Sequence, residues 1–259
     1  MYAPFDLSGK AALITGGNGG IGLGMAEALA QAGADLVIWG TNEQKNAEAK
    51  ATLSAYGRRV FTRRVDVAHE AEVVDGMRAS IAEMGRLDSV FANAGIGKAE
   101  TSFLEITAES FRRIESVNEE GVFFTLREAA KHMVERAKAG DAGGSLIGVA
   151  SLAGIEGAAR NQHYAATKGA VISMMRGIAV ELARYGVRAN TIAPGWIATD
   201  MTARAQAMPV FQEKVISRVP MRRWGKPGDF GGIAVYLASD ASAYHSGDTF
   251  VIDGGYAVF

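Results

Sequence analysis

Short apolar segments alternate along the chain with longer segments in which apolar residues recur every three to four positions. The short segments are typical of buried strands, and the longer ones have the periodicity of helices. Strands that alternate with helices build a parallel sheet covered on both faces, so the pattern predicts an α/β fold. The predicted strands are Lys10–Ile14, Leu36–Trp39, Arg59–Val65, Ser89–Ala92, Ser145–Ala150, Arg188–Ile192 and Thr249–Ile252, and the predicted helices are Ile21–Ala32, Glu43–Tyr56, Glu70–Met84, Ala108–Lys138, Gln162–Tyr185 and Pro227–Ala238.

The pattern contains no internal repeat and no linker rich in Pro or Ser. We therefore expect one Rossmann-like, doubly wound domain over residues 1–259, with a parallel sheet of about seven strands. The segment Thr199–Arg218 interrupts the alternation and carries Met201, Met208, Phe211 and Val215. Because an insertion late in such a fold is typical of a cover over the site, we expect a substrate lid near residues 196–218.

Composition and charge exclude several classes of function. The 27 Lys and Arg residues are balanced by 28 Asp and Glu, so the basic excess of a general nucleic-acid binder is missing. The absence of cysteine excludes disulfides, thiolate catalysis and Cys-ligated metals. The four histidines are scattered without metal spacing, so we expect no metal. We also expect a cytoplasmic protein without a membrane partner, because no signal peptide or membrane-spanning segment is visible.

A glycine-rich turn follows the first predicted strand and leads at once into a helix. It has the sequence Thr15-Gly16-Gly17-Asn18-Gly19-Gly20-Ile21-Gly22. A strand that turns sharply into a helix directs free N–H groups at an anion, and glycine lets the backbone approach a pyrophosphate. The turn could be a plain glycine-rich connection, but its position in the first strand–helix unit favours dinucleotide binding.

A second candidate cluster consists of Ser151, Tyr164 and Lys168. Tyr164 and Lys168 are four residues apart on a predicted helix and therefore share a face. An ammonium near a phenol favours the phenolate, so we expect Lys168 to lower the pKa of Tyr164. Tyr164 would then act as a general acid or base, and Ser151 would bind the substrate oxygen. Alone, such a pair is more often a packed Tyr and a solvated Lys; the glycine-rich turn favours catalysis.

These motifs resemble those of the classical short-chain dehydrogenase/reductase family, from about Leu7 to Tyr256. Further motifs occur in the family's order. They are Asn93-Ala94-Gly95, Asn118 in a Val-Asn-x-x-Gly sequence, Tyr164-x-x-x-Lys168, Pro194-Gly195 and Asp253-Gly254-Gly255. The resemblance implies a Rossmann-like fold, a nicotinamide cofactor and a homotetramer. It also assigns Tyr164 as acid/base, Ser151 as the residue that orients the substrate oxygen, Lys168 as the holder of the nicotinamide ribose, and Asn118 as the holder of a relay water.

The same resemblance implies a set of cofactor contacts. The pyrophosphate and ribose would lie against the glycine-rich turn, and the adenine near the end of the third strand. Asp66 is equally well explained as a simple turn residue before a helix. The implied contacts are Gly16, Asn18, Gly20, Ile21, Gly22, Thr41, Asn42, Asp66, Val67, Asn93, Ala94, Gly95, Tyr164, Lys168, Pro194, Gly195, Ile197 and Thr199.

The choice between NADP and NAD depends on the end of the second predicted strand. A carboxylate there would bind the ribose 2′-hydroxyl of NAD, but this chain has Gly40, followed by Thr41 and Asn42. Lys45 lies one turn further on, while the glycine-rich turn lacks the Lys or Arg frequent in NADP-preferring members. We expect a modest preference for NADP, which Gly40→Asp should reverse, and NAD stays an open alternative.

The predicted function is hydride transfer between the cofactor and a secondary alcohol or ketone. The alternatives are a non-catalytic dinucleotide sensor on the same fold and a sugar-nucleotide epimerase or dehydratase. Intact Tyr164 and Lys168 disfavour the sensor, and the length and glycine spacing disfavour the epimerase. The apolar residues around the expected pocket predict a neutral alcohol or carbonyl substrate. The family resemblance extends to oxoacyl-carrier-protein reductases and sugar dehydrogenases and does not choose between them.

Overall fold

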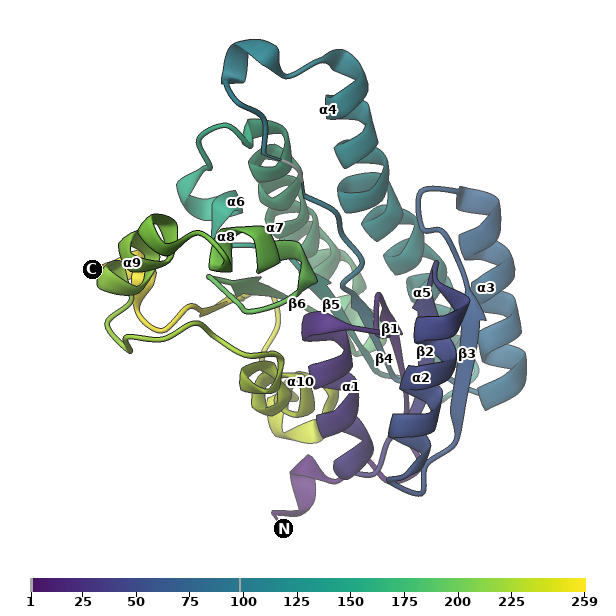
Figure 1. Ribbon diagram of the computed structural model, residues 1–259. Coiled ribbons are helices and arrows are strands. Elements are labelled where there is room, and N and C mark those ends of the chain that lie inside the picture. Colours follow the sequence, from purple (N-terminus) through teal and green to yellow (C-terminus); the bar gives the residue numbers. More distant parts are fainter. Residues whose placement is uncertain (1, 98) are drawn as a thin grey trace.

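The computed structural model describes residues 2–97 and 99–259, which form a seven-stranded sheet in the order β3-β2-β1-β4-β5-β6-β7 (Figure 1). Every neighbouring pair of strands is parallel. The order reverses between β1 and β4, which makes this a doubly wound, Rossmann-like fold, as predicted. The strands are β1 (Ala11–Thr15), β2 (Asp35–Gly40), β3 (Val60–Arg64), β4 (Ser89–Ala92), β5 (Gly144–Val149), β6 (Val187–Pro194) and β7 (Thr249–Ile252).

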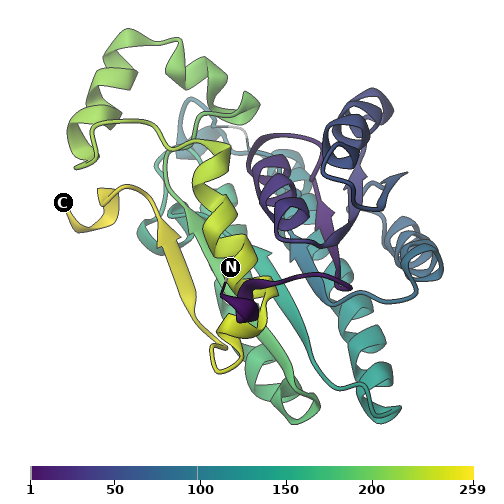
Figure 2. The same ribbon diagram turned by 90° about the horizontal axis from the view of Figure 1, so that it is seen from below.

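Helices cover both faces of the sheet, as Figure 2 shows from below. One layer contains α1 (Gly20–Gln31), α2 (Glu43–Ser54) and α10 (Gly231–Ala238). The other contains α3 (Glu70–Met84), α5 (Gly121–Lys138) and α7 (Gln162–Leu182). The remaining helices are α4 (Ala108–Glu115), α6 (Ala153–Glu156), α8 (Ala203–Gln206) and α9 (Pro209–Arg218).

The pleat of the sheet divides the core into two apolar clusters. Leu13 and Trp39 point to the layer of α3, α5 and α7, whereas their neighbours Ile14 and Ile38 point to the layer of α1, α2 and α10. Alternate residues of a strand face opposite sides, so a strand buried on both faces is continuously apolar. This is why a central strand such as Leu36–Trp39 appears in the sequence as a short unbroken apolar segment.

The predicted helix Ala108–Lys138 is interrupted in the structure. It is divided into α4 and α5 by a wide π-helical turn, Ser116–Glu120, which contains the buried Asn118. The side chain of Asn118 binds both backbone polar groups of Ile96, a contact distant in sequence. Helical periodicity does not encode such a contact, and π turns of this kind often occur at functional sites.

Three smaller differences from the predicted elements concern α6, the end of α7 and the segment 196–218. The helix α6 was not predicted, because four residues are too few for a periodic pattern. The predicted helix Gln162–Tyr185 ends at Leu182 and continues as a 3₁₀ turn. The segment 196–218 holds a 3₁₀ turn, Asp200–Thr202, followed by α8 and α9, which lie at the carboxyl edge of the sheet (Figure 1).

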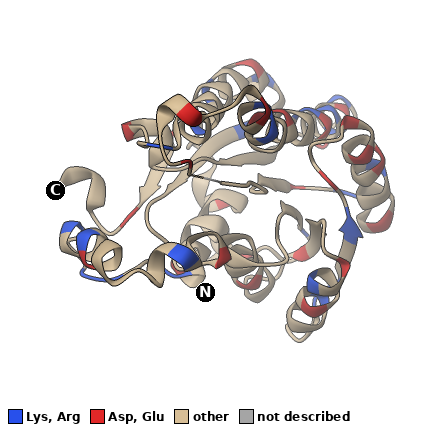
Figure 3. Cartoon of the chain, turned by 45° about the horizontal axis from the view of Figure 1, so that its top comes forward, with Lys and Arg blue, Asp and Glu red and all other residues tan. Residues whose placement is uncertain are grey.

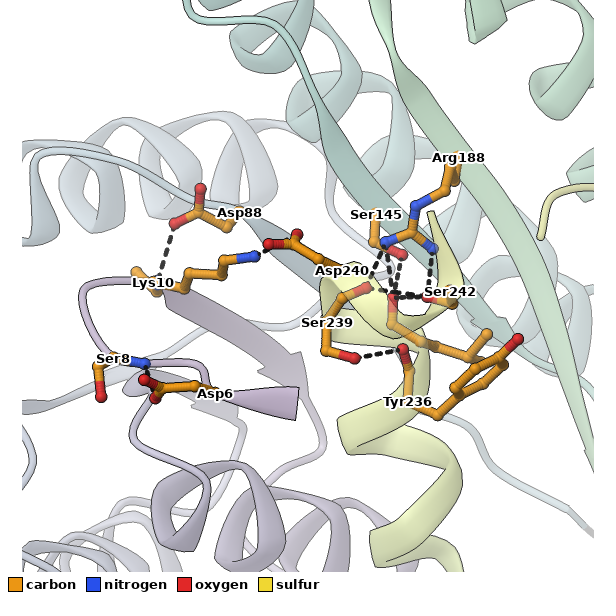
Figure 4. A network of polar contacts seen from close by, with 12 residues as sticks. Asp6, Ser8, Lys10, Asp88, Ser145, Arg188, Tyr236, Ser239, Asp240 and Ser242 are labelled. Carbon is orange, nitrogen blue, oxygen red and sulfur yellow. Dashed lines mark hydrogen bonds and ion pairs between the residues drawn. The ribbon is translucent and has the colours of Figure 1, made fainter. Parts of the chain in front are cut away.

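The opposite edge of the sheet is fixed by a network of polar contacts (Figure 4). Arg188 of β6 donates to Ser242 Oγ at 2.8 Å and to the carbonyl oxygens of Leu237 and Ser239 at 3.1 and 3.3 Å. Lys10 pairs with Asp240 at 2.6 Å. These contacts attach the end of α10 to the start of the strands, so this edge is structural.

Charged residues of both signs are intermixed on the outer helices (Figure 3). This mixed distribution agrees with the net charge of −1. Among the described residues, no helix is long and apolar enough to cross a membrane.

Candidate active site

The carboxyl ends of β1 and β4 diverge at the point where the strand order reverses, and this is where doubly wound folds bind ligands. Thr15 holds the two ends together. Its Oγ1 accepts hydrogen bonds from the backbone N–H groups of Asn93 and Ala94, both at 2.9 Å. Asn93 Nδ2 in turn donates to the Thr15 carbonyl oxygen at 2.9 Å. These bonds bring the predicted Asn93-Ala94-Gly95 segment beside the glycine-rich turn.

The glycine-rich turn has the backbone that a pyrophosphate site requires. Gly16 has φ +63°, a left-handed conformation that favours glycine. A Cβ on Gly22 would overlap the Gly16 carbonyl oxygen and lie 2.6 Å from Asn93 Nδ2, so only glycine fits there. The helix α1 begins at Gly20 without a side-chain cap. The turn therefore fits a phosphate group that approaches the free N–H groups of a helix start.

At the end of β2, the predicted specificity position Gly40 is covered by two amides. Asn18 Nδ2 donates to Asn46 Oδ1 at 2.7 Å, and Asn46 Nδ2 donates to the Gly40 carbonyl oxygen at 3.0 Å. Asn42 caps α2 by accepting from the Lys45 backbone N–H, and Thr41 is exposed. The sequence analysis did not identify Asn46, which is buried inside a polar helix whose apolar pattern is weak.

Asp66 and Val67 follow β3 and have local structural partners. Asp66 Oδ1 accepts from the Ala68 N–H at 3.1 Å, which matches the turn role left open by the sequence. The side chain of Val67 is buried and packs where a Cβ on Gly121 of α5 would be. Any contact between Val67 and a cofactor would therefore have to come from its backbone.

Ser151, Tyr164 and Lys168 meet beyond the carboxyl end of β5, as predicted. Lys168 Nζ lies 5.7 Å from the centre of the Tyr164 ring and donates to the Val149 carbonyl oxygen at 2.8 Å. Ser151 Oγ accepts from the Ala153 N–H at 3.1 Å. Lys168 is buried, whereas Tyr164 and Ser151 are half-buried.

Burial dominates the proton equilibria of this cluster. It raises the pKa of Tyr164, while a hydrogen bond with the Ser151 hydroxyl acts in the opposite direction. It also lowers the pKa of Lys168 to about 8. The expected lowering of the Tyr164 pKa by Lys168 is not found in this structure: burial raises this pKa, and the Lys168 ammonium donates to the Val149 carbonyl oxygen.

Gly95 connects this cluster to Asn118. A Cβ on Gly95 would lie 3.3 Å from Asn118 Oδ1 and 3.4 Å from Lys168 Nζ, so the three residues are packed closely. The Asn118 amide accepts from the Ile96 N–H and donates to the Ile96 carbonyl, both at 2.8 Å. Its side chain thus holds the loop after β4, and the relay-water role stays a prediction.

The segment after β6 covers the glycine-rich turn from above. The side chain of Thr199 lies 3.4 Å from where a Cβ on Gly20 would be, and Ile197 is buried. Met201 and the Tyr164 ring both lie within 4 Å of a Cβ placed on Gly97. The segment therefore contacts both the turn and the Tyr164 cluster. Pro194 and Gly195 start it, with the Gly195 N–H bonded to the Ile252 carbonyl.

An ion pair joins this segment to α2 across the site. Lys45 Nζ lies 2.7 Å from Asp200 Oδ2. The sequence analysis singled out Lys45 but not Asp200. Nothing in the local pattern of either residue indicates a partner 155 positions away.

The chain matches a family profile described as "Enoyl-(Acyl carrier protein) reductase" over residues 16–257. It is 36% identical to 2-dehydro-3-deoxy-D-gluconate 5-dehydrogenase of Escherichia coli (strain K12), with 99% of this chain and 98% of the relative covered. It is also 32% identical to the 3-oxoacyl-[acyl-carrier-protein] reductase of Chlamydia pneumoniae, over 96% of this chain and 97% of the relative.

Among solved structures, the chain resembles a gluconate 5-dehydrogenase from Burkholderia cenocepacia J2315 in complex with NADP and tartrate. The TM-score is 0.93, the sequences are 34% identical, and the match covers 99% of this chain and 98% of that one. The names of these proteins differ in substrate, so their agreement concerns the fold and the reaction class.

Proposed function

Because the chain belongs to the classical short-chain dehydrogenase/reductase family, we propose that it transfers a hydride between NADP or NAD and a secondary alcohol or ketone. The observation that carries the proposal is the position of Ser151, Tyr164 and Lys168 beside the glycine-rich turn. A turn shaped for a pyrophosphate and a proton-transferring group at the same sheet edge are what such a reaction requires.

Tyr164 moves the proton in this proposal. Its phenol gives a proton to the carbonyl oxygen in reduction and takes one from the hydroxyl in oxidation. Burial keeps it protonated near neutral pH, which suits the acid role. Ser151 holds the substrate oxygen, and Lys168 supplies positive charge and a donor for a ribose hydroxyl. The nicotinamide, when bound, supplies or accepts the hydride.

The glycine-rich turn holds the pyrophosphate through Gly16, Gly20 and Gly22, and Asn93 to Gly95 line the adjoining edge. Thr199 and Ile197 contact the nicotinamide end. The segment 196–218 acts as a lid, since it reaches both the turn and Tyr164. The presence of Ser151, Tyr164 and Lys168 together favours catalysis over a sensor that only binds the dinucleotide.

The direct test is a panel of initial rates. Secondary alcohols, polyols, sugar acids and the corresponding ketones are each supplied with NAD(H) and with NADP(H). We expect turnover of at least one alcohol and ketone pair, in both directions. Tight cofactor binding without turnover of any compound in the panel would favour the sensor. The panel also tests the predicted neutral substrate, because the named relatives include enzymes of sugar acids.

Carbonyl reduction should lose efficiency as the pH rises through about 8. Burial lowers the pKa of Lys168 to about 8 and raises that of Tyr164, so Lys168 loses its proton first. Its positive charge is then present below this pH and lost above it. The measurement is kcat/KM for the reduced cofactor, which reports groups of the free protein. An efficiency that stays level up to pH 10 would contradict this assignment.

The preference for NADP over NAD should be about ten-fold and should depend on Lys45. Lys45 lies in the first turn of the helix that follows β2, but its ammonium is already paired with Asp200, which limits what it gains from a 2′-phosphate. Lys45→Ala should remove most of the preference, and Lys50→Ala, on the same helix, should not. The measurement is the ratio of kcat/KM for the two cofactors; a wild type that prefers NAD would refute the expectation.

Gly40→Asp is a less clean test than the sequence suggests. A Cβ on Gly40 would overlap the Asn18 side chain and lie 2.6 Å from Asn46 Oδ1. The variant therefore has to displace the Asn18–Asn46 pair before its carboxylate can reach a ribose. Gly40→Asp should reverse the preference for NADP over NAD only if the Asn18 side chain moves out of the space that the new Cβ occupies.

We also propose a homotetramer, although the chain itself buries most of the apolar side chains of α4, α5 and α7. The buried residues of these helices and of the π-helical turn between α4 and α5 include Ile114, Val117, Val122, Leu126, Val171, Ile172 and Met175. Phe111 and Phe123 stay 40% and 42% exposed, and Val180 of α7 is 83% exposed. These three are the residues for a partner copy to cover. Sedimentation at micromolar concentration should give about four times the chain mass; a monomer would end the proposal.

A further inference from the structure

A buried amide that belongs to none of the recognised motifs lies at the end of β2. Asn46 of α2 is 4% exposed and shares the inner face of that helix with Ala49 and Leu53. The inner face of a helix that packs on a sheet is normally apolar, so an amide there needs hydrogen-bond partners. Asn46 has partners for both its nitrogen and its oxygen, and they come from three other parts of the chain.

Backbone carbonyl groups fix the orientation of this amide. Asn46 Nδ2 donates to the Gly40 carbonyl oxygen of β2 at 3.0 Å and to the Arg63 carbonyl oxygen of β3 at 3.4 Å. Because a carbonyl oxygen can only accept, the Asn46 NH₂ group has to face the strands. Asn46 Oδ1 therefore faces Asn18, whose Nδ2 donates to it at 2.7 Å. The ends of β2 and β3 thus determine how the amides of both Asn46 and Asn18 are turned.

The oxygen of the Asn18 amide is accessible from outside. Asn18 is half-buried in the glycine-rich turn, and its nitrogen is directed at Asn46. Its Oδ1 accepts no hydrogen bond within the described part of the chain, yet it is not among the enclosed side-chain atoms that lack a partner. This oxygen is therefore open to solvent, and it is the acceptor that Asn18 offers to a ligand of the turn.

The Asn18 amide also fills the space in front of Gly40. A Cβ on Gly40 would overlap the Asn18 side chain. A carboxylate at the end of this strand would accept a hydrogen bond from the ribose 2′-hydroxyl of NAD. An amide oxygen can accept from the same hydroxyl, although it carries no charge. The 2′-phosphate of NADP is mostly ionised near neutral pH and presents acceptors, so it gains nothing from a second acceptor.

We propose that Asn46 is a positioning residue for cofactor choice, which holds Asn18 Oδ1 where it accepts a hydrogen bond from the ribose 2′-hydroxyl of NAD. This inference rests on the proposed function, because it takes a nicotinamide dinucleotide as the ligand of the glycine-rich turn. The two amides replace the carboxylate that the chain lacks at Gly40. They support the binding of NAD and so keep the preference for NADP modest.

The test is a calorimetric titration of the full-length protein with NAD and with NADP, without substrate. Asn46→Ala should weaken the binding of NAD about 5- to 10-fold and change that of NADP less than about two-fold. Asn18→Ala removes the accepting oxygen itself and should give the same result. Because Asn46 acts through Asn18, the double variant should lose no more affinity for NAD than the more affected single variant does.

Ser80→Ala is the matched control for the loss of a buried hydrogen bond beside β2. The Ser80 hydroxyl accepts from Trp39 Nε1 at 3.1 Å and donates to the Gly76 carbonyl oxygen at 2.7 Å. Trp39 directly precedes Gly40 but points to the opposite face of the sheet. This variant should therefore have a lower melting temperature and an unchanged ratio of the two dissociation constants. The melting temperature of every variant is measured alongside.

The outcomes separate this inference from the proposed function. A folded Asn46→Ala protein with equal losses for both cofactors, or with none, would overturn the inference alone. Single losses that multiply in the double variant would also overturn it, because the two amides would then act independently. If Asn46→Ala does not fold, Asn18→Ala decides: a selective loss of NAD affinity supports the inference, and unchanged affinity refutes it. A wild type that binds neither cofactor would overturn the proposed function as well.

Discussion

Tyr164→Phe should lower turnover at least about 100-fold, the loss typical of removing a general acid or base. The substitution deletes only the hydroxyl. The ring, which lies within 4 Å of a Cβ placed on Gly97, keeps its packing. Without the phenol, no group on this face of α7 can exchange a proton with the substrate oxygen, since Lys168 Nζ is directed at the Val149 carbonyl.

The measurement for this variant is kcat at saturating substrate, with cofactor affinity from a binding titration as the internal reference. We expect cofactor affinity close to wild type, because the Tyr164 hydroxyl is not needed by the glycine-rich turn. Tyr236→Phe is the matched control: its hydroxyl bonds to His245 at the other edge of the sheet. A Tyr164→Phe protein with more than about half of wild-type turnover would show that another group moves the proton.

Gly22→Ala should weaken cofactor binding by at least about 10-fold while the protein stays folded. The added Cβ would overlap the Gly16 carbonyl oxygen, and a backbone atom cannot rotate out of the way. The turn has to open, which moves the N–H groups of α1 away from the pyrophosphate position. Overpacking of this kind also costs about 1–3 kcal/mol of stability.

The matched control for the glycine-rich turn is Gly232→Ala. Gly232 lies in α10, and a Cβ there would meet nothing within 4 Å. Alanine favours helices over glycine by about 1 kcal/mol, so this variant should be as stable as wild type or more so, with normal cofactor binding. Calorimetric titration with NADP and NAD measures both variants. Normal affinity in Gly22→Ala would mean that the cofactor does not depend on this turn.

The sequence predicts the central strands well because they are buried on both faces, whereas the edge strands β3 and β7 are half-buried. Both ends of every predicted strand lie within two residues of the observed ends. A segment such as Leu36–Trp39 is apolar throughout, so its limits are easy to recognise. The long helix Ala108–Lys138 was predicted less well. Its division at Asn118 depends on a bond to Ile96, which is formed only when the loop after β4 is in place.

In the candidate site, too, local motifs are predictable from the sequence and contacts between distant residues are not. The glycine-rich turn and the Ser151, Tyr164 and Lys168 cluster are local patterns, and the structure brings each of them together. What the sequence misses are pairs distant along the chain, such as Asn18 with Asn46 and Lys45 with Asp200. The direction of the Tyr164 pKa shift is also not predictable from the sequence. Helical spacing identifies neighbouring side chains but not how deeply they are buried.

The most direct test of hydride transfer follows a deuterium label. The best alcohol of the substrate panel, carrying deuterium on its carbinol carbon, is oxidised with the preferred cofactor, and the reduced cofactor is examined by mass spectrometry. Transfer predicts deuterium in nearly every molecule of reduced cofactor formed, with none in the solvent. Deuterium released to water instead, or reduced cofactor without label, would contradict the proposed reaction.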